Sequence, residues 1–232
     1  MRYLALASDY DGTLATHGDV TPTTLDALER FAASGRKLVM VTGRELDELI
    51  SVFPRLDLFD AVVAENGALL YRPATKEERK LGDPPPPGFV ERLRARGIER
   101  ISVGRVIVAT WEPHEATVLD VIKEMGLELQ VIFNKGAVMI LPSGVNKGTG
   151  LEAALDDLGL SLGQTVGVGD AENDHAFLKA CAVGVAVSHA LSSLKEAADL
   201  VTRASHGDGV TELIDRLLEN DLRDLVPRQR SR

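Results

Sequence analysis

The stretch that decides the fold is Asp9-Tyr10-Asp11-Gly12-Thr13-Leu14, which follows the apolar run Tyr3-Leu4-Ala5-Leu6-Ala7-Ser8. A short apolar run bounded by a turn signal predicts a buried strand. In extended backbone, residues i and i+2 point to the same side, so Asp9 and Asp11 can converge on one centre. Two carboxylates held that close repel each other unless a divalent cation or a shared proton offsets the repulsion, and hard oxygen ligands favour Mg²⁺. The alternative is an Asx turn at the end of the strand, which Asp-Gly often forms.

Three further polar clusters occupy comparable places in the chain. Thr42-Gly43-Arg44 follows the apolar run 37–41, and Asp170-Ala171-Glu172-Asn173-Asp174 follows the run 165–169. Asn146-Lys147-Gly148-Thr149 opens a helical pattern between them. In an open parallel sheet the carboxyl ends of the strands form the ligand crevice, so we expect these clusters to meet at one site. Taken singly, each has a plainer interpretation as a strand-to-helix turn, an exposed lysine or a helix cap.

Alternating strand and helix patterns predict an α/β fold with a doubly wound parallel sheet. The pattern changes near residue 72, so we expect a core domain formed by residues 1–72 and 143–232 and an inserted α+β domain at 73–142. The Pro-rich segment 82–88 predicts a stiff extended linker or a plain surface loop. In the insert we expect helices at 89–96 and 115–125, a strand at 101–110, and a hairpin of strands 129–133 and 137–141 joined by Asn134-Lys135-Gly136.

Composition restricts the classes of function. The 232 residues are 44% hydrophobic, and 26 Lys and Arg against 35 Asp and Glu give a net charge of −9. This balance argues against a nucleic-acid partner, because phosphate backbones require a basic face. No apolar stretch approaches a membrane span, and the single Cys181 favours a reducing, cytoplasmic setting. The basic tail 228–232 is expected to be disordered, and the sequence gives no indication of an oligomeric state.

A phosphate monoester is a substrate that would use these residues together. Its hydrolysis is very slow without a catalyst, so an enzyme must supply a nucleophile, a proton donor and charge neutralisation. Asp9 is placed to be the nucleophile and to form an aspartyl-phosphate. Asp11 would protonate the leaving alcohol and then deprotonate the attacking water, and we expect neighbouring negative charge to favour its protonated form.

The same interpretation assigns a metal site and a phosphate site. Mg²⁺ would bind Asp9, the backbone carbonyl of Asp11 and Asp170, with Asp174 anchoring its waters. The groups expected to bind the phosphoryl oxygens are Thr42, Gly43 and Lys147.

The four clusters, in this order, resemble the four motifs of the haloacid dehalogenase superfamily of phosphohydrolases. The matching residues are the D-x-D-G-T-L stretch 9–14, the T-G-R stretch 42–44, Lys147 with Gly148, and the G-D-x-x-N-D stretch 169–174. The insert, together with Glu65-Asn66-Gly67-Ala68, is similar to the branch with a type IIB cap, which includes Cof-like, sucrose-phosphate and phosphoglycolate phosphatases. Ala171 departs from the glycine that many relatives carry.

The resemblance implies an Mg²⁺-dependent phosphatase acting on a small phosphorylated metabolite, such as a sugar phosphate or a phosphoglycolate-like ester. The supporting residues it implies are Asn173, Arg44 and Asn66, and candidate substrate contacts in the cap are Arg105, His114 and Lys135. Trp111 is a further candidate for substrate contact, but its plainer interpretation is a place in the cap core, as that of His114 is a helix start. Two alternatives stay open: a phosphotransferase or phosphomutase on the same scaffold, and a non-catalytic metabolite-binding protein.

Overall fold

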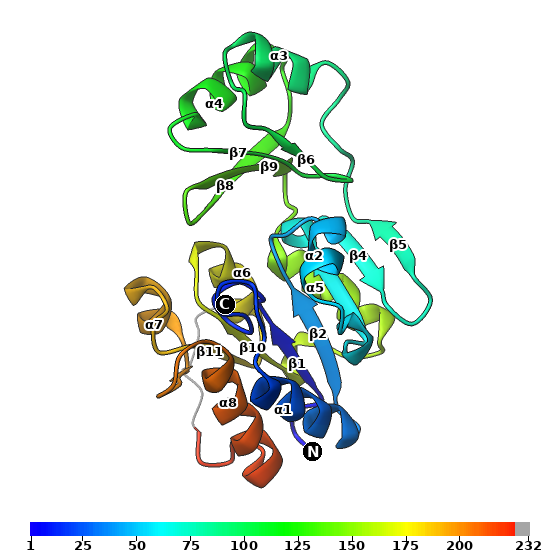
Figure 1. Cartoon of the computed structure of the whole chain (residues 1–232), viewed down its shortest axis with the longest axis vertical. Helices are drawn as coiled ribbons and strands as arrows, with labels where there is room; N and C mark the ends of the chain where they lie inside the picture. The colour runs from blue at the N-terminus through cyan, green and yellow to red at the C-terminus, as the bar shows by residue number, and fades with distance from the viewer. Residues whose placement is uncertain (226–232) are drawn as a thin grey trace.

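The computed structural model describes residues 1–225, which form a larger unit with a smaller one above it (Figure 1). The larger unit contains an eight-stranded sheet of order β12-β11-β10-β1-β2-β3-β4-β5. Neighbouring strands from β12 to β3 pair in parallel, whereas β4 and β5 pair antiparallel. The strands are β1 (Ala5–Ser8), β2 (Lys37–Val41), β3 (Ala61–Ala64), β4 (Leu69–Arg72), β5 (Glu77–Lys80), β10 (Thr165–Gly169), β11 (Val183–Ala186) and β12 (Leu200–Val201). The doubly wound α/β fold predicted from the sequence is confirmed.

Helices cover this sheet, with α1 packed against α8 and α5 against α6. Helix α1 begins where Thr21 caps it and Pro22 takes its first position, because proline loses no hydrogen bond there. Strands β1, β2 and β10 are buried along almost their whole length, as expected for parallel strands covered on both faces. The helices of the larger unit are α1 (Pro22–Ala33), α2 (Leu46–Val52), α5 (Lys147–Asp157), α6 (His175–Ala180), α7 (Ser192–Ala197) and α8 (His206–Asn220), with short 3-10 turns η1 (Leu56–Leu58), η2 (Glu65–Gly67), η3 (Leu162–Gln164) and η4 (Glu172–Asp174).

The smaller unit is an antiparallel sheet of order β6-β7-β9-β8 with two helices on its outer face (Figure 1). Side chains alternate along its strands. Val138 and Ile140 of β9 join the core under the helices, whereas Met139 and Leu141 face the larger unit. One face of this sheet thus packs against the helices of the smaller unit, and the other face is directed toward the larger unit. Its elements are α3 (Phe89–Ala95), β6 (Ser102–Val103), β7 (Val108–Trp111), α4 (Glu115–Glu124), β8 (Leu129–Asn134) and β9 (Ala137–Pro142).

Two local expectations are wrong. Strand β5, at 77–80, pairs with β4 in the large sheet, so the insert begins later than residue 73. The single strand expected at 101–110 is split into β6 and β7, because the backbone amides of 105–107 donate to the Glu65 carboxylate instead of to a strand. The hairpin is confirmed, with its strands ending at 134 and 142.

Within residues 1–225, no helix combines the length and the apolar character needed to cross a bilayer. The basic tail 228–232, for which disorder was expected, lies outside the described residues.

Candidate active site

Three carboxylates meet where β1 and β10 end. These strands pair in parallel, with Ser8 opposite Val168, so Asp9 and Asp170 leave the sheet at the same edge. Asp174 follows in the turn η4. One carboxylate oxygen from each of Asp9, Asp170 and Asp174 lies within 4.8 Å of the other two, and all three residues are buried. The convergence expected from the sequence is therefore present.

Lys147 lies among these carboxylates. Its Nζ is 2.6 Å from Asp9 Oδ1 and 2.6 Å from Asp174 Oδ1, and the residue is 1% exposed. Burial alone lowers the pKa of Lys147, but the carboxylates of Asp174 and Asp9 outweigh it and raise the pKa above its usual value. The interpretation of Lys147 as an exposed surface lysine is excluded.

The local backbone explains how Lys147 reaches this position. Asn146 caps α5 by accepting hydrogen bonds from the amides of Gly148 and Thr149. Gly67 lies directly against this cap. A Cβ at Gly67 would be 2.0 Å from the Asn146 carbonyl oxygen, and its φ of +106° also favours glycine. The Asn-Gly pair after β3 thus lets the start of α5 approach the sheet.

The charge of this cluster suits a divalent cation. Burial and the nearby Asp174 raise the pKa of Asp9 to about 7, against the opposing effect of Lys147. Asp174 Oδ2 accepts hydrogen bonds from the amides of Asp170 and Ala171, and its Oδ1 accepts from Lys147, so Asp174 is held by the protein itself. Three buried carboxylates face one buried ammonium, and hard oxygen ligands match Mg²⁺. Asp9 and Asp170 are the side chains that could bind the ion directly.

Asp11 differs from the expectation. Its two carboxylate oxygens accept hydrogen bonds from Arg44 Nε and Nη2, at 2.6 and 2.7 Å, so its closest partner is a cation and not another acid. Arg44 also donates to Glu48 Oε1 at 2.5 Å. These hydrogen bonds to Asp11 raise the pKa of Arg44. The side chain of Asp11 is thus turned away from the carboxylate cluster, and its backbone carbonyl accepts a hydrogen bond from Lys135.

The residues after β2 and β3 lie beside this centre. The Thr42 hydroxyl is buried and accepts a hydrogen bond from the amide of Arg44. Asn173 Nδ2 donates to Asn66 Oδ1 at 2.8 Å. The remaining amide atoms, Asn66 Nδ2 and Asn173 Oδ1, are buried without a hydrogen-bond partner. Gly43 and Asn173 line the cavity described next, whereas Thr42 and Asn66 do not.

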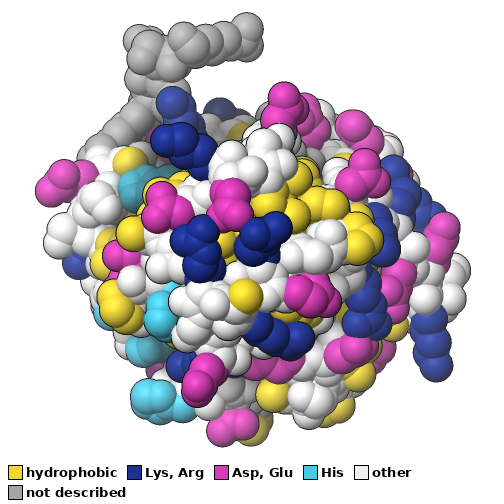
Figure 2. Space-filling model, turned by 90° about the horizontal axis from the view of Figure 1, so that it is seen from above, with side chains coloured by type: hydrophobic (Ala, Val, Ile, Leu, Met, Phe, Trp, Pro, Cys, Tyr) yellow, Lys and Arg dark blue, Asp and Glu magenta, His cyan; other side chains and the backbone are white. Residues whose placement is uncertain are grey.

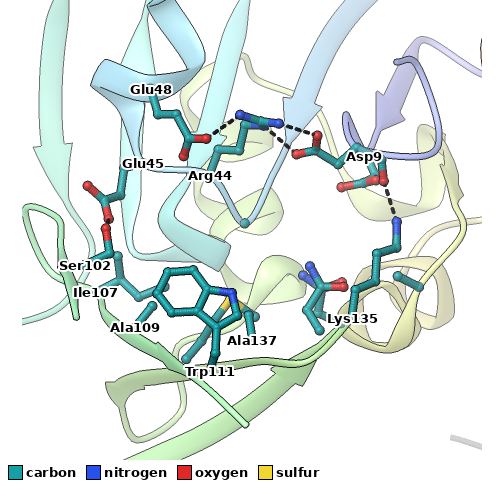
Figure 3. Close-up of a pocket in the computed structure, with 16 residues that line it drawn as sticks. Asp9, Arg44, Glu45, Glu48, Ser102, Ile107, Ala109, Trp111, Lys135 and Ala137 are labelled. Carbon is teal, nitrogen blue, oxygen red and sulfur yellow. Dashed lines mark hydrogen bonds and ion pairs between the residues drawn. The ribbon is translucent and has the colours of Figure 1, made fainter. Parts of the chain in front are cut away.

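A cavity of about 390 Å³ lies between the two units, and Asp9 is the member of the carboxylate cluster that lines it (Figure 3). This volume is in the range of small-molecule sites. Its floor includes Asp9 and Asp11. The smaller unit contributes Ser102, Ile107, Ala109, Trp111, Asn134, Lys135, Ala137 and Met139.

The candidate cap contacts have different positions. Lys135 lines the cavity. Arg105 instead forms ion pairs with Asp47 and Glu78, and His114 is the N-cap residue of α4. The expectation that Trp111 packs in the cap core is wrong. Its ring lines the cavity, and the Arg100 guanidinium lies 3.4 Å from the ring centroid.

Sequence reasoning missed the role of Glu65. Its buried carboxylate accepts hydrogen bonds from the backbone amides of Arg105, Val106 and Ile107, at 2.7, 2.8 and 2.9 Å. This contact fixes the loop between β6 and β7 to the larger unit. An acidic residue directly after the buried strand β3 is the signal that could have indicated it, because a buried carboxylate requires partners.

The comparison with known families agrees with this geometry. The sequence profile of the haloacid dehalogenase-like hydrolases matches residues 6–81 and 105–214. The chain belongs to this family. The two matched ranges contain all four motifs, and the segment between them includes the Pro-rich linker and α3.

Haloacid dehalogenase-like relatives match over nearly the whole chain. The phosphoglycolate phosphatase 2 of Saccharolobus solfataricus is 32% identical, over 94% of this chain and 94% of its own. The phosphoglycolate phosphatase of Methanothermobacter thermautotrophicus is 30% identical, over 92% of this chain and 98% of its own.

Solved structures of the family share the fold. A haloacid dehalogenase-like hydrolase from Bacteroides thetaiotaomicron superposes with a TM-score of 0.76 at 19% identity, over 93% of this chain and 99% of its own. A subclass IIB sugar phosphatase superposes with a TM-score of 0.75 at 22% identity, over 92% and 98%.

Proposed function

We propose that this protein is an Mg²⁺-dependent phosphatase that hydrolyses a small phosphorylated metabolite. The observation that carries the proposal is the gathering of Asp9, Asp170, Asp174 and Lys147 beside one cavity, which Asp9 lines. Relatives of about this chain's length are named phosphoglycolate phosphatases, which supports a small phosphate monoester as the substrate. The surface seen from the cap side intersperses basic with acidic side chains, which fits a small substrate better than a nucleic acid (Figure 2).

In the proposed reaction, a carboxylate oxygen of Asp9 attacks phosphorus. The bond from phosphorus to the ester oxygen breaks, and the leaving alcohol takes a proton from Asp11. A water molecule then attacks the aspartyl-phosphate and loses its proton to Asp11. The products are the alcohol and inorganic phosphate, and Asp9 is regenerated.

The hydrogen bonds of Asp11 add a condition to this scheme. Both of its carboxylate oxygens are occupied by Arg44, so Asp11 must leave that pair before it can donate a proton. Glu48 is a second partner that can retain Arg44 when this happens. We propose that the Arg44 pair holds Asp11 away from the centre until substrate is bound.

Charge neutralisation comes from two sources. Lys147 is fixed by Asp9 and Asp174 and can contact the phosphoryl oxygens beside Asp9. Bound Mg²⁺ would supply further positive charge at Asp9, Asp170 and the Asp11 carbonyl. Gly43, where a Cβ would lie 3.5 Å from Asn173 Nδ2, completes the proposed phosphate-binding wall.

We propose that residues 82–142 act as the cap of this site. Ile107, Trp111 and Met139 line the cavity on the side of this cap, and a cap closed over the substrate would exclude all water except the attacking molecule. The cavity volume of about 390 Å³ suits a small phosphorylated metabolite.

The experiment is phosphate release from a panel of phosphorylated metabolites with Mg²⁺. We expect turnover of small esters by the native protein, loss of turnover with excess chelator, and no turnover by Asp9→Asn. The matched control is Asp26→Asn, an exposed aspartate of α1. Full activity of Asp9→Asn would contradict the assignment of the nucleophile. Phosphoryl transfer to an added sugar in preference to water would indicate a phosphotransferase instead.

A further inference from the structure

Lys135 joins the tip of the cap to the acidic centre. It lies in the turn between β8 and β9, and its Nζ is 2.7 Å from the Asp11 carbonyl oxygen and 2.8 Å from Asp170 Oδ2. Figure 3 shows its side chain directed from the hairpin toward the loop that follows β1. A Cβ at Gly12 would be 2.6 Å from Lys135 Nζ and 2.6 Å from Asp170 Oδ2, and the φ of +89° at this position also favours glycine.

The Asp11 carbonyl oxygen and Asp170 Oδ2 are oxygen ligands of the kind that a divalent ion binds. Mg²⁺ binds oxygen ligands at about 2.0–2.1 Å, and an ammonium in contact with the same two oxygens would repel it strongly. The contacts of Lys135 and an ion bound at Asp170 and the Asp11 carbonyl are therefore alternatives. When the ion binds, Lys135 loses both partners.

The other cations near the cavity each keep a carboxylate partner. Lys147 is buried between Asp9 and Asp174, and Arg44 keeps Glu48 when Asp11 leaves it in the proposed reaction. The side chain of Lys135 is 47% exposed, so it can turn into the cavity when it is released. Its ammonium then lies close to the phosphate site, since Asp170 is within 4.8 Å of Asp9.

We propose that Lys135 selects substrates that carry a second anionic group, such as a carboxylate, close to the phosphorylated carbon. Ion binding frees Lys135 for this role, so one hairpin residue links metal occupancy to substrate choice. The inference rests on the proposed phosphatase function. It adds to that function the residue that discriminates between a charged and a neutral ester of the same size.

The first test compares two short esters, 2-phosphoglycolate and ethyl phosphate, in the native protein and in Lys135→Met. We expect the ratio of kcat/KM for 2-phosphoglycolate to kcat/KM for ethyl phosphate to fall about 10- to 100-fold in the variant. A loss of this size corresponds to about one hydrogen bond between charged groups. Lys135→Arg should retain most of the ratio. The matched control is Lys123→Met, which removes an exposed lysine from the cap helix α4.

The second test measures Mg²⁺ binding to the substrate-free protein by calorimetry. Lys135→Met should bind Mg²⁺ more tightly than the native protein does, because no ammonium has to be displaced. An unchanged ester ratio together with unchanged or weaker Mg²⁺ binding would overturn the proposal. If the native protein hydrolyses neither ester, the phosphatase proposal has failed for such substrates, and the calorimetric comparison still tests the exchange of cations.

Discussion

At the scale of single residues, the centre depends on how buried charges are paired. Lys147 is almost completely buried, and both of its partners are buried carboxylates. Removing one partner of a buried ion pair is costly because the remaining charge has no solvent to stabilise it. The lysine is thus needed for stability as well as for the proposed chemistry.

Lys147→Met should abolish turnover and lower the free energy of unfolding by about 3 kcal/mol, since two buried carboxylates lose their cation. Urea denaturation without divalent ions measures the loss. Adding Asp9→Asn to this variant should recover part of the lost stability, because it removes one of the two unpaired carboxylates. If Lys147→Met alone were as stable as the native protein, Lys147 would not contribute to stability.

At the scale of elements, Glu65 fixes the cap loop to the larger unit. Both Glu65 and Asn66 have positive φ values, 51° and 55°, which are uncommon for residues other than glycine. The Glu65 carboxylate accepts three backbone hydrogen bonds from 105–107, beside the buried apolar contact of Ala68 with Val106. This contact holds Ile107 at the cavity wall.

Glu65→Gln should lower the free energy of unfolding by about 2 kcal/mol, because an amide nitrogen replaces one acceptor oxygen and leaves buried donors unpaired. We also expect a higher KM for small esters, since Ile107 and its neighbours would lose their fixed position. Urea denaturation and steady-state kinetics measure the two effects. Glu91→Gln, at an exposed position of α3, is the control, and equal effects of the two substitutions would contradict the role of Glu65.

The end of α8 supports a second prediction at this scale. Asp221 accepts hydrogen bonds from the amide of Arg2 and from Arg36 Nη2. Burial raises the pKa of Asp221, but these two partners outweigh burial and bring it below its usual value. A carboxyl whose pKa is lower in the folded state contributes stability above its unfolded pKa, and this contribution is lost as pH falls through the folded pKa.

Asp221→Asn should therefore lower the free energy of unfolding by about 1–3 kcal/mol at pH 7. The difference from the native protein should persist down to about pH 5 and shrink below about pH 4, where the unfolded carboxyl takes up its proton. Urea denaturation over this pH range gives the profile. A difference that does not depend on pH would indicate that the carboxylate charge contributes nothing.

At the scale of the whole molecule, ion binding should be linked to folding. The proposed ligands Asp9 and Asp170 are far apart in the sequence and meet only in the folded state. A ligand that binds only the folded state stabilises it by an amount that grows with the logarithm of the ratio of ligand concentration to dissociation constant.

Mg²⁺ at about 100 times its dissociation constant should raise the midpoint of thermal unfolding by on the order of 5–10 °C. Scanning calorimetry measures the shift, which a chelator should reverse. Asp170→Asn should abolish most of the shift, whereas Asp26→Asn should keep it. A midpoint that does not respond to Mg²⁺ in the native protein would contradict the metal site.

The sequence by itself determined the alternation of strands and helices. It also determined the positions of the four polar clusters along the chain. Asp9 and Asp170 could be predicted to meet, because parallel strands bring their carboxyl ends to one edge whatever their separation along the chain. Local pattern also predicted the hairpin that carries Lys135, since its turn chemistry is contained in adjacent residues.

Only the tertiary structure decided the partners of individual charges. The Arg44 pair turns Asp11 away from the other acids, Glu65 binds the loop that splits the expected cap strand, and Lys135 reaches oxygens of the larger unit. Each of these contacts joins side chains from different elements, and its geometry depends on how the two units pack. Periodicity and turn signals describe one element at a time, so they carry no information about a contact made between two.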